Sequence, residues 1–223
     1  MSGKKNRNKN KKTAENKAKS GMLIPVITGV TAAVLIITLA CLAAFGGKNT
    51  KEERKMNEVI KVLVEMEDGS DFTLALYPEY SPKTVENFVK LVNEGFYEGV
   101  GFHRVVEGFM AQGGDPEGTG MGGSDETIPG EFASNGFADN TLSHTRGVIS
   151  MARSQDPNSA SSQFFICYDN ASFLDGQYAA FGEVIDGMET VDAFLDVERT
   201  YNEMGELATP TTPITMKKLT VIE

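Results

Sequence analysis

An uncharged run of 24 residues, from position 22 to position 45, constrains the folding of this chain more than any other feature. As an α-helix the run would be about 36 Å long, against about 30 Å for the hydrocarbon core of a bilayer. A helix of a small soluble domain needs only one apolar face, whereas this run is apolar on every face. The run predicts a single transmembrane helix over residues 22–45 and leaves the rest of the chain outside the bilayer.

The segment before this run is strongly basic, although the whole chain has a net charge of −10. Residues 1–20 hold eight Lys or Arg and one Glu. Such a composition predicts a disordered tail over residues 1–21, which the positive-inside rule places in the cytoplasm beside anionic lipid. The part after the helix would then be extracytoplasmic at the cell membrane. A nucleic-acid-binding arm fits this context poorly, and no nucleic-acid partner is expected.

Two other fates of the apolar run stay open. A cleaved signal peptide is one, although its apolar region normally has about 7 to 15 residues. A lipoprotein is the other, with cleavage before Cys41 and lipid on that thiol. Each alternative leaves the globular part on the same side of the membrane as an uncleaved anchor does.

Residues 46–57 are polar and begin with two glycines, which predicts a flexible linker to one globular domain over residues 58–223. The two cysteines, Cys41 and Cys167, lie in different parts of the chain, so no disulfide is expected. Two lone thiols and two separated histidines also do not provide a structural zinc site. No metal or cofactor is expected.

Apolar and polar residues alternate along most of the domain, as they do in β-strands. Two segments with helical spacing lie between these stretches. Strands are predicted over residues 59–66 and 71–76, with later ones including 180–185 and 214–222. Ser81 as N-cap and Pro82 in the first turn begin one helix, which Gly95 ends. Met188, Val191 and Leu195 predict a second, short helix. About eight short strands and two helices favour an α+β or barrel domain.

The stretch over residues 101–115 holds the most unusual chemistry. At period two, Phe102, Arg104 and Val106 fall on one face of a strand, and His103 and Val105 fall on the other. Placing a guanidinium among apolar neighbours costs folding free energy, so an arginine at this position indicates a function. A second strand over residues 162–167 places Gln163 and Phe165 on one face, so two such strands could build one pocket.

The end of this stretch and the segment after it are rich in glycine. The pair at 113 and 114 allows backbone or a ligand to approach closely. A literal GxGxxG comes next, but residues 124–130 have no helical stripe and end in Pro-Gly, so no dinucleotide site is predicted.

Several long sequence motifs resemble those of the cyclophilins, which are peptidyl-prolyl cis/trans isomerases. The motifs are FHRVVEGFMAQGGD, SMAR followed by SQFFIC, and FLDGQYAAFGEVIDGM, and the resemblance extends over residues 59–223. The resemblance implies a mainly β fold, a closed eight-stranded antiparallel barrel capped by two helices. It also implies a groove on the outside of the barrel and a monomeric catalytic domain that binds proline-containing polypeptides.

The resemblance also assigns roles residue by residue. Arg104 matches the catalytic arginine. The residues that match the walls of the proline pocket are Phe109, Met110, Phe165 and Leu174. Gln112 and Gln163 match the side-chain amides that orient the peptide backbone and the arginine. His103 matches a groove histidine, which either packs beneath the groove or contacts substrate. His144 is interpreted as structural.

The sequence departs from the family pattern at several groove positions. Phe173 stands where many members have Trp, and Tyr178 where many have a second histidine. Arg153 stands where Asn often pairs with substrate backbone, and its loop is one residue longer. Because Phe lacks the indole N–H, weak binding of cyclosporin is expected.

The chemistry that this set must perform is rotation about a partial double bond. The barrier for an Xaa-Pro bond is about 18 to 20 kcal/mol, and a turnover of about 10 to 1000 per second needs the protein to supply about 4 to 7 kcal/mol. An apolar pocket and a donor to the imide nitrogen suffice, and Arg104 can be that donor. The predicted function is isomerisation without covalent or acid/base chemistry, assisting the folding of exported or surface proteins. The alternative is a tethered proline-binding or chaperone module without catalysis.

Overall fold

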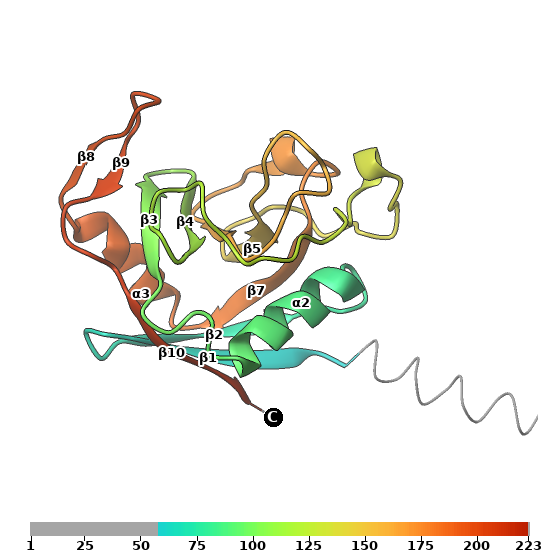
Figure 1. Ribbon diagram of the computed structural model, residues 1–223, viewed down its shortest axis with the longest axis horizontal. Coiled ribbons are helices and arrows are strands. Elements are labelled where there is room, and N and C mark those ends of the chain that lie inside the picture. The colour runs from blue at the N-terminus through green and yellow to red at the C-terminus, as the bar shows by residue number, and fades with distance from the viewer. Residues whose placement is uncertain (1–57, 223) are drawn as a thin grey trace, which may run out of the picture. The chain divides into compact units, whose positions relative to one another are not determined.

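The computed structural model describes residues 58–222, which form a mainly β fold with two α-helices (Figure 1). Eight antiparallel strands form one sheet in the order β10-β1-β2-β7-β5-β6-β4-β3, and β8 and β9 form a separate hairpin. The strands are β1 (Ile60–Met66), β2 (Asp71–Leu76), β3 (Gly101–Val106), β4 (Met110–Asp115), β5 (Val148–Met151), β6 (Phe164–Cys167), β7 (Ala180–Asp186), β8 (Arg199–Tyr201), β9 (Leu207–Pro210) and β10 (Met216–Ile222).

The helices are α2 (Pro82–Asn93) and α3 (Met188–Ala193), with 3₁₀ turns η1 (Ala133–Asn135), η2 (Ser172–Leu174) and η3 (Phe194–Asp196). Helix α2 packs against β10, and α3 packs against β2. The second predicted helix is thus confirmed as α3 continued by η3. Within residues 58–222 no helix has the length and hydropathy to cross a bilayer. The predicted transmembrane helix over residues 22–45 lies outside the described residues.

The sheet is an open half-barrel rather than the closed barrel that the resemblance implies. Its edge strands are β10 and β3, which are not joined by a regular ladder. An isolated bridge between Gly101 and Thr215 links them, together with a hydrogen bond from the N–H of Phe102 to the carbonyl of Ile214 (2.9 Å). At the same end of β3, its register with β4 shifts twice between Gly101 and Arg104. The prediction of full closure was wrong, whereas eight strands in one sheet are confirmed.

Alternate residues of β6 belong to two different apolar clusters. Phe164 and Ile166 lie in the main core, which fills one face of the curved sheet. Phe165 and Cys167 lie with Met110 in a smaller cluster on the other face. This separation follows from the period-two geometry of a strand. The smaller cluster forms the floor on which the candidate site is built.

Helix α2 begins where the sequence predicts, but a different group caps it. Ser81 is at the N-cap position without a side-chain cap, and its hydroxyl instead donates to the carbonyl of Ala180 (2.9 Å). The carboxylate of Glu131, only 4% exposed, accepts the N–H groups of Lys83 (2.9 Å) and Thr84 (2.8 Å). A negative charge at a helix N-terminus is stabilising. Ser81 is therefore the N-cap residue, as predicted, but the side-chain cap is provided by the distant carboxylate of Glu131.

The glycine-rich loop after β4 binds a carboxylate of its own chain. Asp115 accepts backbone N–H groups from Glu117 (2.8 Å), Thr119 (3.0 Å), Gly120 (2.6 Å) and Gly122 (3.2 Å). Burial by itself would raise the pKa of Asp115, but these hydrogen bonds together lower it. The N–H groups that a phosphate would need are therefore used to fix the loop.

His144 is held in a buried network, with its ring stacked on that of Phe165 at a centroid distance of 6.0 Å. Its Nδ1 lies 2.8 Å from Oδ1 of Asp175, and its Nε2 lies 3.0 Å from the hydroxyl of Ser150. Ser150 is fully buried, so the triad-like arrangement has no access to a substrate. Burial lowers the pKa of His144 below 6.5, although Asp175 acts in the opposite direction. The contact between His144 and Asp175 is therefore a hydrogen bond to a neutral imidazole and not an ion pair.

The two histidines should make the domain less stable in mild acid. Burial lowers the folded-state pKa of both His144 and His103. A group whose pKa is lower in the folded state resists protonation there, so stability is lost as the pH falls below the unfolded value of about 6.5. The urea midpoint should decrease between about pH 7 and pH 5.5. Measuring His144→Gln and His103→Gln separately assigns the effect, and an unchanged slope in both variants would contradict it.

Candidate active site

Arg104 reaches the outer face of the sheet because β3 contains a bulge. The register shift between Phe102 and Arg104 leaves His103 as the extra residue. Phe102 therefore lies in the main core together with Val105, whereas Arg104 faces the smaller cluster. The prediction that Phe102 and Arg104 share a face was wrong, because strict alternation does not survive a bulge. The glycine pair within β4 has the expected role, since a Cβ at Gly113 would lie 2.9 Å from the carbonyl of Gly101.

A chain of side-chain amides holds one side of the guanidinium. Arg104 and Gln112 are direct partners across β3 and β4, and Nη1 of Arg104 donates to Oε1 of Gln112 (3.1 Å). The amide nitrogen of Gln112 donates to Oε1 of Gln163 (2.9 Å), and Gln163 donates to the carbonyl of Gly122 (2.8 Å). Both glutamines thus orient Arg104, one directly and one through its neighbour.

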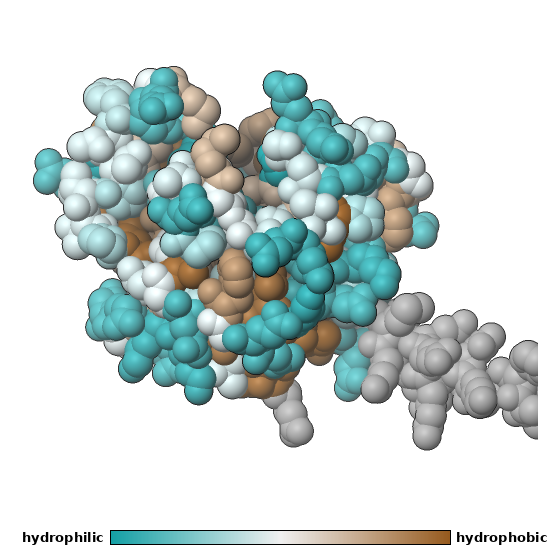
Figure 2. All heavy atoms as spheres, in the orientation of Figure 1, coloured by the Kyte–Doolittle hydropathy of each residue, from teal (hydrophilic) through white to brown (hydrophobic). Residues whose placement is uncertain are grey.

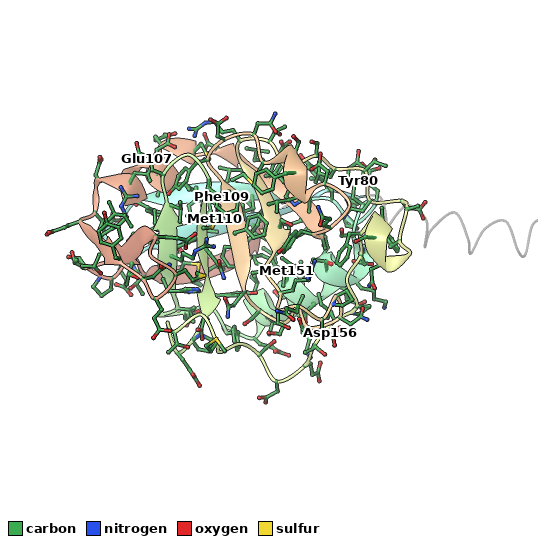
Figure 3. The ribbon with its side chains drawn as sticks, turned by 90° about the horizontal axis from the view of Figure 1, so that it is seen from above. Tyr80, Glu107, Phe109, Met110, Met151 and Asp156 are labelled. Carbon is green, nitrogen blue, oxygen red and sulfur yellow. The ribbon has the colours of Figure 1, made fainter. Side chains whose placement is uncertain are left out.

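A pocket of about 160 Å³ lies beside Arg104. We call it the Arg104 pocket; it is lined by Arg104, Phe109, Met110, Gln112, Ala152, Arg153, Phe165, Leu174 and Tyr178. Figure 2 shows a hollow between two raised lobes, where Figure 1 places the β8–β9 hairpin on one side and the loops around β5 on the other. Figure 3 shows Phe109 and Met110 above the strands, with Glu107 at the turn before them.

Seven of the ten residues predicted for the site line this pocket, as the preceding list shows. Gln163 instead lines an adjoining cavity of about 360 Å³, which shares Gln112, Ala152 and Arg153 with the pocket. Phe173 lies at the rim, 64% exposed, with its ring centroid 5.8 Å from that of Phe109. The structure therefore brings nine of the ten into one groove and leaves His103 apart.

His103 lies beneath the groove, at the seam of the half-barrel. It lines a different cavity, of about 330 Å³, together with Asp115. Both ring nitrogens are buried and have no hydrogen-bond partner among residues 58–222. Burial lowers the pKa of His103, the charge of Asp115 opposes this, and Arg104 reinforces it. Of the two interpretations left open by the sequence, this geometry favours packing beneath the groove.

Arg153, which stands at a groove position where the family often has Asn, also lines the pocket, although it was not among the ten predicted site residues. Its guanidinium carbon lies 4.5 Å from the ring centroid of Tyr178 and 5.2 Å from that of Phe132. Its nitrogens donate to the carbonyls of Gln177 (2.9 Å) and Ser154 (2.9 Å). Arg153 is thus fixed by aromatic faces and carbonyls, and no carboxylate within residues 58–222 forms an ion pair with it.

Glu206 is a partner of Arg104 that the sequence did not reveal. Glu206 lies in the turn of the β8–β9 hairpin, and its carboxylate accepts hydrogen bonds from Nε (2.8 Å) and Nη2 (2.6 Å) of Arg104. The hydrogen bond from Arg104 lowers the pKa of Glu206. Because the partners are 102 positions apart and the hairpin has no periodicity, no sequence signal could have paired them.

Comparison with known proteins gives consistent matches. A family model described as cyclophilin type peptidyl-prolyl cis-trans isomerase/CLD matches residues 61–221. A probable peptidyl-prolyl cis-trans isomerase of Brucella suis is 46% identical over 143 residues, which cover 59% of this chain and 69% of that protein. Peptidyl-prolyl cis-trans isomerase B of Bacillus subtilis is 45% identical over 124 residues, covering 56% of this chain and 82% of that protein.

Solved structures agree with the sequence matches. A cyclophilin type peptidyl-prolyl cis-trans isomerase from Cryptosporidium parvum is similar with a TM-score of 0.63 and 31% identity, covering 74% of this chain and 99% of that one. Fold, pocket and relatives together define a peptidyl-prolyl cis-trans isomerase. The chain belongs to the cyclophilin-type family of these enzymes.

Proposed function

We propose that Arg104 is the catalytic residue and that rotation about the Xaa-Pro bond proceeds without covalent or acid/base chemistry. The observation that supports this is the placement of Arg104 Nη1 at the wall of an apolar pocket, 3.9 Å from the sulfur of Met110. The Cryptosporidium parvum relative was crystallised in the presence of the dipeptide Ala-Pro. Proline-containing polypeptides are the corresponding substrates here.

The residues of the pocket divide the work between binding and catalysis. Phe109, Met110, Phe165 and Leu174 surround the proline ring and remove water from the imide. Desolvation strengthens the interaction of the charged guanidinium with the imide nitrogen, whose lone pair is localised in the twisted state. A preorganised donor of this kind contributes about 3 to 4 kcal/mol, most of the 4 to 7 kcal/mol that the reaction requires.

No side chain of the pocket is arranged as a nucleophile. The nearest thiol in the smaller cluster, Cys167, is fully buried, and burial raises its pKa to about 12. It would be a neutral thiol near pH 7. A rotation that neither forms nor breaks a bond does not need such a group.

The rate should therefore depend little on pH. Because burial lowers the pKa of His103, that residue is neutral and does not titrate near pH 7 to 8. We expect kcat/KM to stay within about 2-fold between about pH 6.5 and pH 8. The measurement is a pH series of peptide isomerisation for wild type and His103→Gln. A bell-shaped wild-type profile that disappears in His103→Gln would show acid/base participation.

Refolding of a protein whose slow phase is limited by Xaa-Pro exchange tests the activity. The full-length chain in detergent, at a few per cent of the refolding protein, should accelerate the slow phase without changing the fast phase. A binding module would leave the slow phase unchanged or delay it. Stoichiometric rather than catalytic dependence would therefore support the alternative of a proline-binding or chaperone module.

We further propose that the enzyme acts outside the cell membrane on exported or surface proteins, tethered by residues 22–45. The uncharged length of that segment and the basic residues before it support this arrangement. Full-length protein should stay with membranes after carbonate washing, and protease added from outside should remove the domain while sparing the basic tail. A soluble mature form would indicate a cleaved signal, and lipid on Cys41 would indicate a lipoprotein.

A further inference from the structure

The guanidinium of Arg104 is held from two directions. On one side Gln112 accepts from Nη1 at 3.1 Å. On the other, the two oxygens of Glu206 accept from Nε at 2.8 Å and from Nη2 at 2.6 Å. This is the bidentate geometry that matches a carboxylate to a guanidinium. The three nitrogens are thus all engaged, and Nη1 is the one that also borders the pocket through Met110.

Glu206 is itself fixed by the turn of the β8–β9 hairpin. The side chain of Asn202 donates to Oε2 of Glu206 (2.8 Å) and accepts the N–H of Glu206 (2.9 Å) and of Met204 (3.0 Å). Gly205 closes the turn with a φ of 77°, in the region that favours glycine. The turn thus orients the carboxylate before it meets Arg104.

Packing at the tip of the hairpin does not explain this ion pair. Tyr201, Met204 and Leu207 are 73%, 70% and 47% exposed, so the tip buries little apolar surface. Partly exposed ion pairs usually contribute little to stability. The side chains of Arg104 and Glu206 are 21% and 31% exposed, so their ion pair is not expected to contribute much to the stability of the fold.

The contact has a direct consequence for catalysis. An unpaired arginine samples many rotamers, and that freedom must be lost when the guanidinium meets the twisted imide. A fixed carboxylate removes the freedom before substrate binds. Because the carboxylate takes Nε and Nη2, it also selects Nη1 as the nitrogen presented to the pocket.

We propose that Glu206 is a positioning residue for Arg104, so that the β8–β9 hairpin forms part of the catalytic apparatus. The proposal rests on the function proposed above, because it assumes that Arg104 acts on the substrate. It predicts that loss of the carboxylate lowers kcat rather than raising KM, since the walls of the Arg104 pocket are untouched. It also predicts that Glu206 has no effect once Arg104 is absent.

The experiment compares Glu206→Gln with Glu203→Gln in the full-length chain. Both changes remove one carboxylate from the same hairpin, but Glu203 is exposed and forms no ion pair within the described residues. For Glu206→Gln we expect kcat to fall about 10- to 30-fold with KM within about 3-fold, as when a long side chain regains its rotamer freedom. Glu203→Gln should match wild type.

Two further measurements separate the possible failures. The ¹⁵N relaxation of Arg104 Nε reports its order directly, and this order should drop in Glu206→Gln but not in Glu203→Gln. In the Arg104→Ala background, adding Glu206→Gln should change the residual rate less than about 2-fold. If Glu206→Gln keeps wild-type kcat while Arg104→Ala is inactive, the positioning role is overturned alone. If Arg104→Ala is fully active, the proposed mechanism itself is overturned.

Discussion

Replacing Arg104 with Ala is expected to lower kcat/KM about 100- to 1000-fold, the loss typical of removing one preorganised donor from a transition state. The change removes the guanidinium that is proposed to donate to the imide, while the four apolar residues that would hold the proline ring stay in place. Arg104 belongs to neither apolar cluster and its side chain is 21% exposed, so the fold should survive. Peptide isomerisation rates and thermal unfolding together measure both parts of this expectation.

Two controls define what the loss means. Arg104→Lys keeps the charge but not the planar fork, so it cannot hold Glu206 and Gln112 together and should restore little activity. Arg146→Ala removes another arginine that pairs with a carboxylate, Asp192 at 2.6 Å, outside the Arg104 pocket. It should leave kcat/KM unchanged. Near-wild-type activity of Arg104→Ala would refute the catalytic assignment.

Phe173→Trp is expected to tighten cyclosporin binding about 5- to 150-fold, the effect of one hydrogen bond of about 1 to 3 kcal/mol formed in a desolvated groove. The resemblance to cyclophilins places an indole N–H at this position, and Phe supplies the ring without the donor. Phe173 lies at the rim against Phe109 and is 64% exposed, so a larger ring can be accommodated. Calorimetric titration of both forms measures the change.

Turnover should change much less than inhibitor affinity, because Phe173 does not line the Arg104 pocket. We expect kcat/KM of Phe173→Trp within about 3-fold of wild type. Phe173→Tyr is a useful comparison, since it adds a donor at a different position on the ring. Equal cyclosporin affinity of wild type and Phe173→Trp would contradict the assignment of this residue to the inhibitor contact.

Local pattern predicted the elements of the domain well. The strand over residues 71–76 and the start of α2 agree with the structure, because period-two alternation and a first-turn proline are encoded by neighbouring residues. The separation of Phe164 from Phe165 follows from the same rule. Four of the seven predicted residues that line the pocket, Arg104, Met110, Gln112 and Phe165, lie on β3, β4 and β6, which are adjacent in the sheet.

Features that depend on distant contacts were not accessible from the sequence. The bulge at His103 moves Phe102 into the core, and nothing in the local alternation signals an inserted residue. The carboxylates of Glu131 and Glu206 find partners 47 or more residues away. The opening of the half-barrel depends on how β3 meets β10, which are the first and last strands of the sheet order. Each of these is a tertiary property that local spacing cannot specify.

The central claim is that Arg104 catalyses the rotation while the apolar walls bind the proline. Exchange NMR of an Ala-Pro peptide tests both in one sample, because cross-peaks between cis and trans report catalysis and shift changes report binding. We predict that wild-type enzyme produces exchange cross-peaks at catalytic concentration, whereas Arg104→Ala binds the peptide with similar affinity and produces none. Exchange by Arg104→Ala at the wild-type rate, or binding by wild type without exchange, would contradict the account.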